Sequence, residues 1–189
     1  MQLRRGVLAP LLARAEGAAT EDLTLWHFSE DPTIEVFEPH HGELHALDDA
    51  LVWAVDTRHQ WLYWFPRECP RACWNANEQT TEEDVERWLD GDRTRRVAVI
   101  ESRWLERMHS VKLYAYRLPP ETFEPWDKFF VSRETVVPLE LVELGDLPAR
   151  HADAGIELRS APALYPLWDA VTRTTLDYSG IRLRNAVRA

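Results

Sequence analysis

The sequence predicts an α+β fold, in which a mostly antiparallel, split β-sheet is flanked by short helices. Strand-like and helix-like segments alternate irregularly along the 189 residues, without the regular crossover rhythm of a doubly wound parallel sheet. The sequence contains no glycine-rich dinucleotide motif, Walker loop or internal repeat. A chain of this length buries about 70% of its unfolded surface, so it needs no disulfide or metal to be stable. We predict a flexible N-terminal extension over residues 1–22 and a single domain over residues 23–189.

Residues 51–74, LVWAVDTRHQWLYWFPRECPRACW, contain four of the nine Trp and both Cys. The first five residues predict a buried strand, and Asp56 with Thr57 predicts the cap of a helix that Pro66 ends. Apolar residues at helical spacing would give this helix a broad apolar face. The stretch is therefore either the centre of a core or one wall of a pocket.

The remaining elements follow from periodicity and from capping residues. Further strands are predicted in residues 23–29, 71–74, 95–101, 112–118 and 156–159, and two more within residues 129–144, divided near Pro138. Helices are predicted in residues 80–89, 102–108, 146–155 and 165–179, the last of them ended by Gly180. Residues 33–39 read as an irregular extended piece, and residues 39–50 as a polar loop around Gly42.

The charge balance and the cysteine count limit the partners that we expect. With 32 acidic and 22 basic residues the net charge is -10, which opposes nonspecific binding to nucleic acid or to an anionic membrane. Two Cys form no disulfide framework, so we predict a reducing, cytoplasmic location. Arg4 and Arg5 precede an apolar run as in a signal peptide, but Pro10 and Arg14 interrupt this run.

Two groups of residues could bind a metal. His40, His41, Glu43 and His45 could ligate zinc and serve a metal-dependent enzyme, although their spacing matches no standard motif and a solvated loop is the simpler interpretation. Cys69 and Cys73 could join His59 in a second site, but buried free thiols are simpler there. We therefore predict no metal-binding residues.

A third group consists of His27, Tyr63 and Glu134, each of which alone is more often structural. The LWHFS segment around His27 resembles the LWHGS strand of poly- and mono-ADP-ribosyltransferases. LVWAVDTRHQWLY resembles the strand–Asp–helix element of that superfamily, which ends in its active-site Tyr, and SRETVV resembles the strand that opens with its catalytic Glu. The resemblance implies an ADP-ribosyltransferase-like fold.

The same resemblance implies a role for each catalytic candidate. His27 would hydrogen-bond the adenosine ribose of NAD, Ser29 would support the nicotinamide amide, and Tyr63 would stack on the nicotinamide ring. Glu134 would hold a ribose hydroxyl and stabilise the oxocarbenium-like transition state as nicotinamide departs. NAD would then be a substrate and not a permanently bound cofactor.

Two more residues are expected to bind NAD, and one departs from the pattern of the superfamily. Trp53 would line the cleft, and Arg67 would contact the dinucleotide. Phe28 stands where many members have Gly, and its side chain would crowd the approach of nicotinamide to the backbone. The chain would thus be an NAD-dependent glycosyl (ADP-ribosyl) transferase. The alternative is a noncatalytic binding or interaction domain with a Trp-rich core or pocket.

Most of the chain is also similar to an uncharacterised bacterial family with three motifs of the LYHFSEDP, FPRDCPR and IRLRNA type. These read LWHFSEDP in residues 25–32, FPRECPR in residues 65–71 and IRLRNA in residues 181–186. This similarity implies no known activity. The arginines of the motifs could bind a phosphate or carboxylate ligand, or pair with the abundant Asp and Glu: Arg67, Arg71, Arg182 and Arg184.

Overall fold

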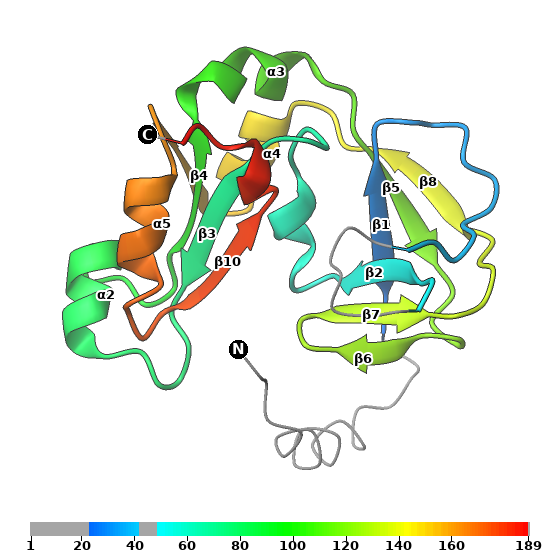
Figure 1. Cartoon of the computed structure of the whole chain (residues 1–189), viewed down its shortest axis with the longest axis horizontal. Helices are drawn as coiled ribbons and strands as arrows, with labels where there is room; N and C mark the ends of the chain where they lie inside the picture. Colours follow the sequence, from blue (N-terminus) through cyan, green and yellow to red (C-terminus); the bar gives the residue numbers. More distant parts are fainter. Residues whose placement is uncertain (1–22, 42–48, 189) are drawn as a thin grey trace. The chain divides into compact units, whose positions relative to one another are not determined.

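The computed structural model describes residues 23–41 and 49–188, and most of its helices and strands are labelled in Figure 1. The described residues form two β-sheets and four short α-helices, which makes this a mixed α+β protein, as the sequence predicted. The predictions for residues 1–22, and for Glu43 and His45 of the histidine-rich loop, lie outside the described residues. No helix in the described part of the chain has the length and apolar character that spanning a bilayer requires.

Contacts group the chain into two compact units, whose described parts we call the first and second units. The first unit comprises residues 23–27, 33–41, 49–59 and 116–141, and the second comprises residues 28–32, 60–115 and 142–188. This grouping does not test the prediction of a single domain over residues 23–189, which stays a prediction.

The first sheet has six strands in the order β6-β7-β2-β1-β5-β8. Their bounds are β1 Leu25–Ser29, β2 Val52–Asp56, β5 Tyr114–Leu118, β6 Glu124–Trp126, β7 Phe129–Ser132 and β8 Glu140–Glu143. β2 pairs antiparallel with β1 and with β7, and β7 pairs antiparallel with β6. β6 escaped prediction because it is a short, fully exposed edge strand with Pro125 at its centre, and so carries no alternating apolar pattern.

The second sheet has four strands in the order β10-β3-β4-β9. Their bounds are β3 Arg71–Asn75, β4 Arg96–Glu101, β9 Ile156–Ala161 and β10 Asp177–Ile181. β3 pairs antiparallel with β10 and β4, whereas β4 and β9 are parallel. The predicted mostly antiparallel arrangement is therefore confirmed, with one parallel pair in this sheet.

The α-helices begin and end close to the predicted positions, apart from the end of the last one. They are α2 Glu82–Leu89, α3 Leu105–Ser110, α4 Leu147–Asp153 and α5 Tyr165–Val171. In α2 the Thr81 hydroxyl accepts a hydrogen bond from the Asp84 amide, and the first turn is acidic. Asp90 and Gly91 then end the helix with positive φ angles of 50° and 77°.

Two predicted helices are wrong over part of their length. Residues 177–181 form β10 and not the end of a helix, since the Thr174 hydroxyl bonds the Val171 carbonyl and accepts from the Leu176 amide, which diverts the backbone from helical pairing. After β2 there is a single 3₁₀ turn, η2 Gln60–Tyr63. Pro66 follows too soon for a longer helix.

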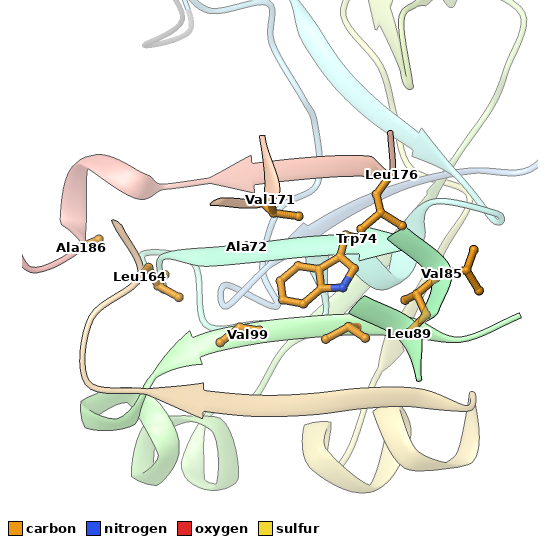
Figure 2. Packing of buried hydrophobic residues seen from close by; sticks show 10 residues of the cluster. Ala72, Trp74, Val85, Leu89, Val99, Leu164, Val171, Leu176 and Ala186 are labelled. Atoms are coloured by element: carbon orange, nitrogen blue, oxygen red, sulfur yellow. The ribbon is translucent and has the colours of Figure 1, made fainter. Parts of the chain in front are cut away.

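The core of the second unit surrounds Trp74, which is 1% exposed (Figure 2). In Figure 2 its indole lies among side chains that come from β3, β4 and α2 and from the segments around α5 and β10. The buried members of this cluster are Ala72, Trp74, Val85, Leu89, Val97, Val99, Leu164, Val171, Leu176 and Ala186. The end of the Trp-rich stretch is therefore the centre of a core, which was one of its two predicted roles.

Candidate functional site

His27 lies on β1 with its imidazole in a fixed orientation. Its Nδ1 atom is 2.9 Å from the carbonyl oxygen of Trp53, and its ring packs against Phe37 with the centroids 4.7 Å apart. A carbonyl oxygen can only accept, so Nδ1 carries the proton of this hydrogen bond. In the neutral imidazole, Nε2 is then an acceptor.

Glu134 lies two residues after the end of β7, and its amide donates to the Ser132 hydroxyl at 3.1 Å. Two residues further on, Val136 and Phe37 exchange two backbone hydrogen bonds of 2.8 and 2.9 Å. Phe37 therefore contacts the His27 ring with its side chain and the segment after Glu134 with its backbone. This double contact brings two of the three predicted catalytic residues into the same part of the first unit.

The carboxylate of Glu134 is exposed and makes no ion pair or hydrogen bond with any described residue. Its neighbour Arg133 pairs with Asp49 and Glu124, at 3.1 Å in both cases. Because Arg133 is used by these two carboxylates, the charge of Glu134 stays open to a ligand.

Ser29 and Trp53, two of the residues predicted to bind NAD, make structural contacts. Ser29 is buried, and its hydroxyl accepts a hydrogen bond from the Asp31 amide at 3.1 Å, which supports the turn after β1. Trp53 is half-buried on β2 and meets Phe129 edge to face at 6.1 Å. Their predicted roles toward NAD stay predictions.

Tyr63 lies at the end of η2 in the second unit. Phe28 is stacked with it, with centroids 6.2 Å apart and planes at 9°, and the Arg71 guanidinium lies 5.4 Å from its centroid. Burial raises the pKa of the Tyr63 phenol, so this group is neutral at physiological pH. Phe28, expected to crowd the nicotinamide, is thus a packing partner of Tyr63.

The FPRECPR and IRLRNA motifs bind each other through Glu68 in the second unit. The Asn185 amide donates to the Glu68 backbone carbonyl and to its carboxylate, at 2.9 Å each. Arg182 and Arg184 approach the same carboxylate at 3.8 and 3.6 Å. The hydrogen bond from Asn185, aided by the nearby arginines, lowers the pKa of Glu68. Pairing with an acidic residue, one of the two predicted roles, is therefore confirmed for Arg182 and Arg184.

Arg67, the last residue predicted to bind NAD, has an exposed side chain. Its backbone amide donates to the Glu30 carboxylate at 2.9 Å, and Glu30 also pairs with Arg107. The carboxylate of Glu30 in LWHFSEDP thus holds the backbone of FPRECPR, and a role of the Arg67 side chain toward NAD stays a prediction.

Arg71 differs from the other motif arginines because it is buried, with 3% of its surface exposed. Its Nε donates to the Leu62 carbonyl at 2.8 Å, and its Nη1 donates to the Cys69 carbonyl at 3.0 Å. The guanidinium also lies 5.0 Å from the Phe65 ring centroid. No carboxylate of the described residues pairs with it. The sequence places Arg71 in a motif but does not reveal this burial.

The sequence matches the family of unknown function DUF6886 over residues 26–186, which includes nearly all of the three motifs. The chain belongs to this family. The family similarity inferred from the motifs is therefore confirmed, and membership in DUF6886 assigns no activity. No curated protein and no solved structure matched the chain. The resemblance to ADP-ribosyltransferases accordingly stays a hypothesis.

The described residues of this DUF6886 member include no group of three or more side chains that could hold a metal ion. Cys69 and Cys73 are buried free thiols, as the simpler interpretation predicted. His59 is bonded to Asp56 at 2.8 Å, and the Nδ1 atom of His40 lies 3.3 Å from the Glu38 carbonyl oxygen.

Large exposed apolar side chains gather on the first unit close to the Phe37–Val136 bridge. Val137, Leu139 and Leu141 alternate along the chain and are 61%, 55% and 44% exposed. Val36 precedes the bridge and is 43% exposed. We call these four residues the apolar row.

Proposed function

We propose that this protein binds NAD and cleaves the bond between nicotinamide and ribose, as an ADP-ribosyltransferase-like enzyme. The observation that supports this most strongly is the double contact of Phe37, whose ring packs on His27 and whose backbone pairs with the segment after Glu134. An oriented imidazole and an unpaired carboxylate in one part of the first unit suit the recognition of ribose hydroxyls.

His27 would bind the adenosine ribose. Its Nδ1–H donates to the Trp53 carbonyl, so Nε2 would accept a hydrogen bond from a ribose hydroxyl. The contact with Phe37 holds the ring in this orientation. Pre-orientation of this kind lowers the entropy cost of binding.

Glu134 would act on the ribose attached to nicotinamide. When the bond between the nicotinamide nitrogen and C1′ breaks, its electron pair leaves with nicotinamide and positive charge develops on the ribose. A fixed carboxylate beside that charge lowers the barrier, and removal of one such electrostatic contact costs about 10²–10³ in rate in other enzymes. Addition of water at C1′, with loss of a proton, would give ADP-ribose as the second product.

The proposal is tested by nicotinamide release from NAD, measured chromatographically with wild type, Glu134→Gln and Glu35→Gln. Glu35 is the matched control, because it is exposed in the same unit, has no ion pair with a described residue and precedes Phe37 by two residues. We expect release by wild type and Glu35→Gln, and a decrease of about 10²-fold or more in Glu134→Gln with an unchanged Tm. A fully active Glu134→Gln variant, or wild type that releases no nicotinamide, would refute the proposal.

We propose a noncatalytic interaction domain as a second candidate function, and the apolar row is the observation behind it. Val36, Val137, Leu139 and Leu141 are all more than 40% exposed, and grouped exposed apolar residues are typical of interaction sites. Self-association through this row would give a concentration-dependent mass in light scattering that Leu139→Glu abolishes. A monomer at all concentrations would count against self-association.

A further inference from the structure

The strongest unexplained feature outside the proposed His27–Glu134 site is the charge of Arg71 in the second unit. A guanidinium has five N–H donors. Arg71 uses two atoms, Nε and Nη1, for hydrogen bonds to the carbonyls of Leu62 and Cys69. Its Nη2 group has no acceptor among the described residues. A buried charge without a counter-ion is costly, so a guanidinium of this kind indicates an anionic ligand.

Two groups near Arg71, the Cys69 thiol and the Tyr63 phenol, do not supply a negative charge. Burial raises the pKa of the Cys69 thiol to about 12, so it stays protonated. The Tyr63 phenol is also neutral, because burial raises its pKa. Aromatic ring faces of Tyr63 and Phe65, at 5.4 and 5.0 Å from the guanidinium, attract the cation only weakly compared with an anion.

Two carboxylates lie close to Arg71, that of Glu68 along the chain and that of Glu101 across the sheet, and both already have other partners. Glu68 accepts from Asn185 and faces Arg182 and Arg184. Glu101 follows Ile100, the β4 partner of Arg71, but its two oxygens accept from Arg103 at 2.8 Å and from the Val187 amide at 2.7 Å. Neither forms an ion pair with Arg71.

A second cation adds to the positive potential around Arg71. Arg182 has a left-handed backbone with φ 55°, and its Nε lies 3.8 Å from the Glu68 carboxylate, beside FPRECPR. Arg182 directly follows Ile181, the β10 partner of Arg71, and after burial its charge also helps to lower the pKa of Arg71. Two guanidinium groups on neighbouring residues of paired strands make the surrounding potential favourable for an anion.

We propose that Arg71 anchors a binding site for a phosphate-bearing small molecule, with the Tyr63 ring as its wall and Arg182 at its rim. The flat, forked guanidinium matches the oxygens of a phosphate group, and its remaining N–H donors can bind them in pairs. The two backbone carbonyls already fix the fork in place. This inference does not rest on the proposed NAD cleavage, because it concerns other residues and needs no reaction.

The test is a thermal-shift titration of the full chain with inorganic phosphate, pyrophosphate and ADP-ribose, at matched ionic strength in chloride. The variants are Arg71→Met, which is close in length, and Arg87→Met as a control on the exposed face of α2. A ligand that binds only the folded state raises Tm with the logarithm of its concentration. We expect this rise in wild type and Arg87→Met and its loss in Arg71→Met. A response to pyrophosphate or ADP-ribose but not to inorganic phosphate would support a diphosphate ligand. A response to all three ligands would support recognition of a single phosphate group.

A second measurement covers the case in which Arg71→Met does not fold, since the Leu62 and Cys69 carbonyls lose their donor. The side-chain N–H signals of Arg71 can be followed by NMR in wild type during the same titrations. We expect saturable shifts of the Arg71 Nη signals. An unchanged Arg71 signal, a flat response to all three ligands, or the same Tm rise in a folded Arg71→Met variant would overturn the proposal.

Discussion

The substitution Gly180→Ala tests the packing of β10, the element that sequence patterns predicted wrongly. A Cβ atom added at Gly180 would lie 2.6 Å from Cη2 of Trp168 and 2.6 Å from Cδ1 of Leu183. The Trp168 ring also meets Tyr178 edge to face at 5.6 Å, which limits its freedom to move away. The new methyl group must therefore displace an aromatic ring that is held from another side.

The expected cost follows from two opposing terms. Overpacking of this kind costs about 1–3 kcal/mol. The lower entropy of the unfolded alanine chain returns about 0.4–1 kcal/mol. We expect Gly180→Ala to lower the free energy of unfolding by about 1–2 kcal/mol, or Tm by about 2–8 °C for a chain of this length.

Urea unfolding of Gly180→Ala, Gly180→Asn and Gly180→Ala with Trp168→Leu provides the assay. If Gly180 ended a helix in a left-handed conformation, Asn would be tolerated better than Ala. In β10 as described here, the Asn side chain is larger than that of Ala, so Gly180→Asn should cost at least as much as Gly180→Ala. Trp168→Leu should relieve part of the cost of Gly180→Ala. Gly155→Ala is the control, since Gly155 has φ 66° and open space around it, so its cost is independent of Trp168. A well-tolerated Gly180→Asn, or no coupling to Trp168, would refute the packing described here.

Three further predictions concern the second unit. Burial lowers the pKa of His151 to about 4 from 6.5, so His151 contributes stability that is complete above pH 6.5 and is lost as the pH falls toward 4. The lost stability reaches about 3 kcal/mol. In urea unfolding from pH 7.5 to 4.5, the free energy of unfolding should depend less on pH in His151→Gln than in wild type. The exposed control His109→Gln should keep the pH dependence of wild type. Leu89→Ala, in the Trp74 core, should cost about 2–5 kcal/mol in the same assay, and a cost below 1 kcal/mol would contradict that core. Thr81→Ala should cost about 0.5–2 kcal/mol of stability through loss of the α2 cap. Thr81→Ser keeps the capping hydroxyl and should retain most of that stability.

Most strands and helices could be predicted because they carry strong local signals. β4 is an apolar run with two Val and one Ile, and α2 has a capping Thr followed by three acidic residues. β10 has no such signal, since it reads DYSGI with alternate residues exposed. Its strand conformation depends on five backbone pairs with β3, which are far away in the sequence. Long-range pairing of this kind overrides local preference.

The candidate sites depend even more on long-range contacts. Nothing local predicts that Phe37 and Val136 pair, although this bridge brings the segment of Glu134 to Phe37 and so to His27. The burial of Arg71 is equally hidden, because periodicity in a stretch rich in Trp does not tell a core arginine from a surface one. In contrast, the motifs that hold Glu68 and Asn185 could be found from family similarity before their mutual hydrogen bonds were known.

The most direct test of the proposed function is NAD binding itself. Thermal shifts of wild type and His27→Ala should be measured with increasing NAD, with nicotinamide release followed in the same samples. We predict that NAD raises the Tm of wild type at millimolar concentration or below, that His27→Ala weakens this shift, and that nicotinamide appears over time. Wild type with an unchanged Tm and no released nicotinamide would contradict the proposed function.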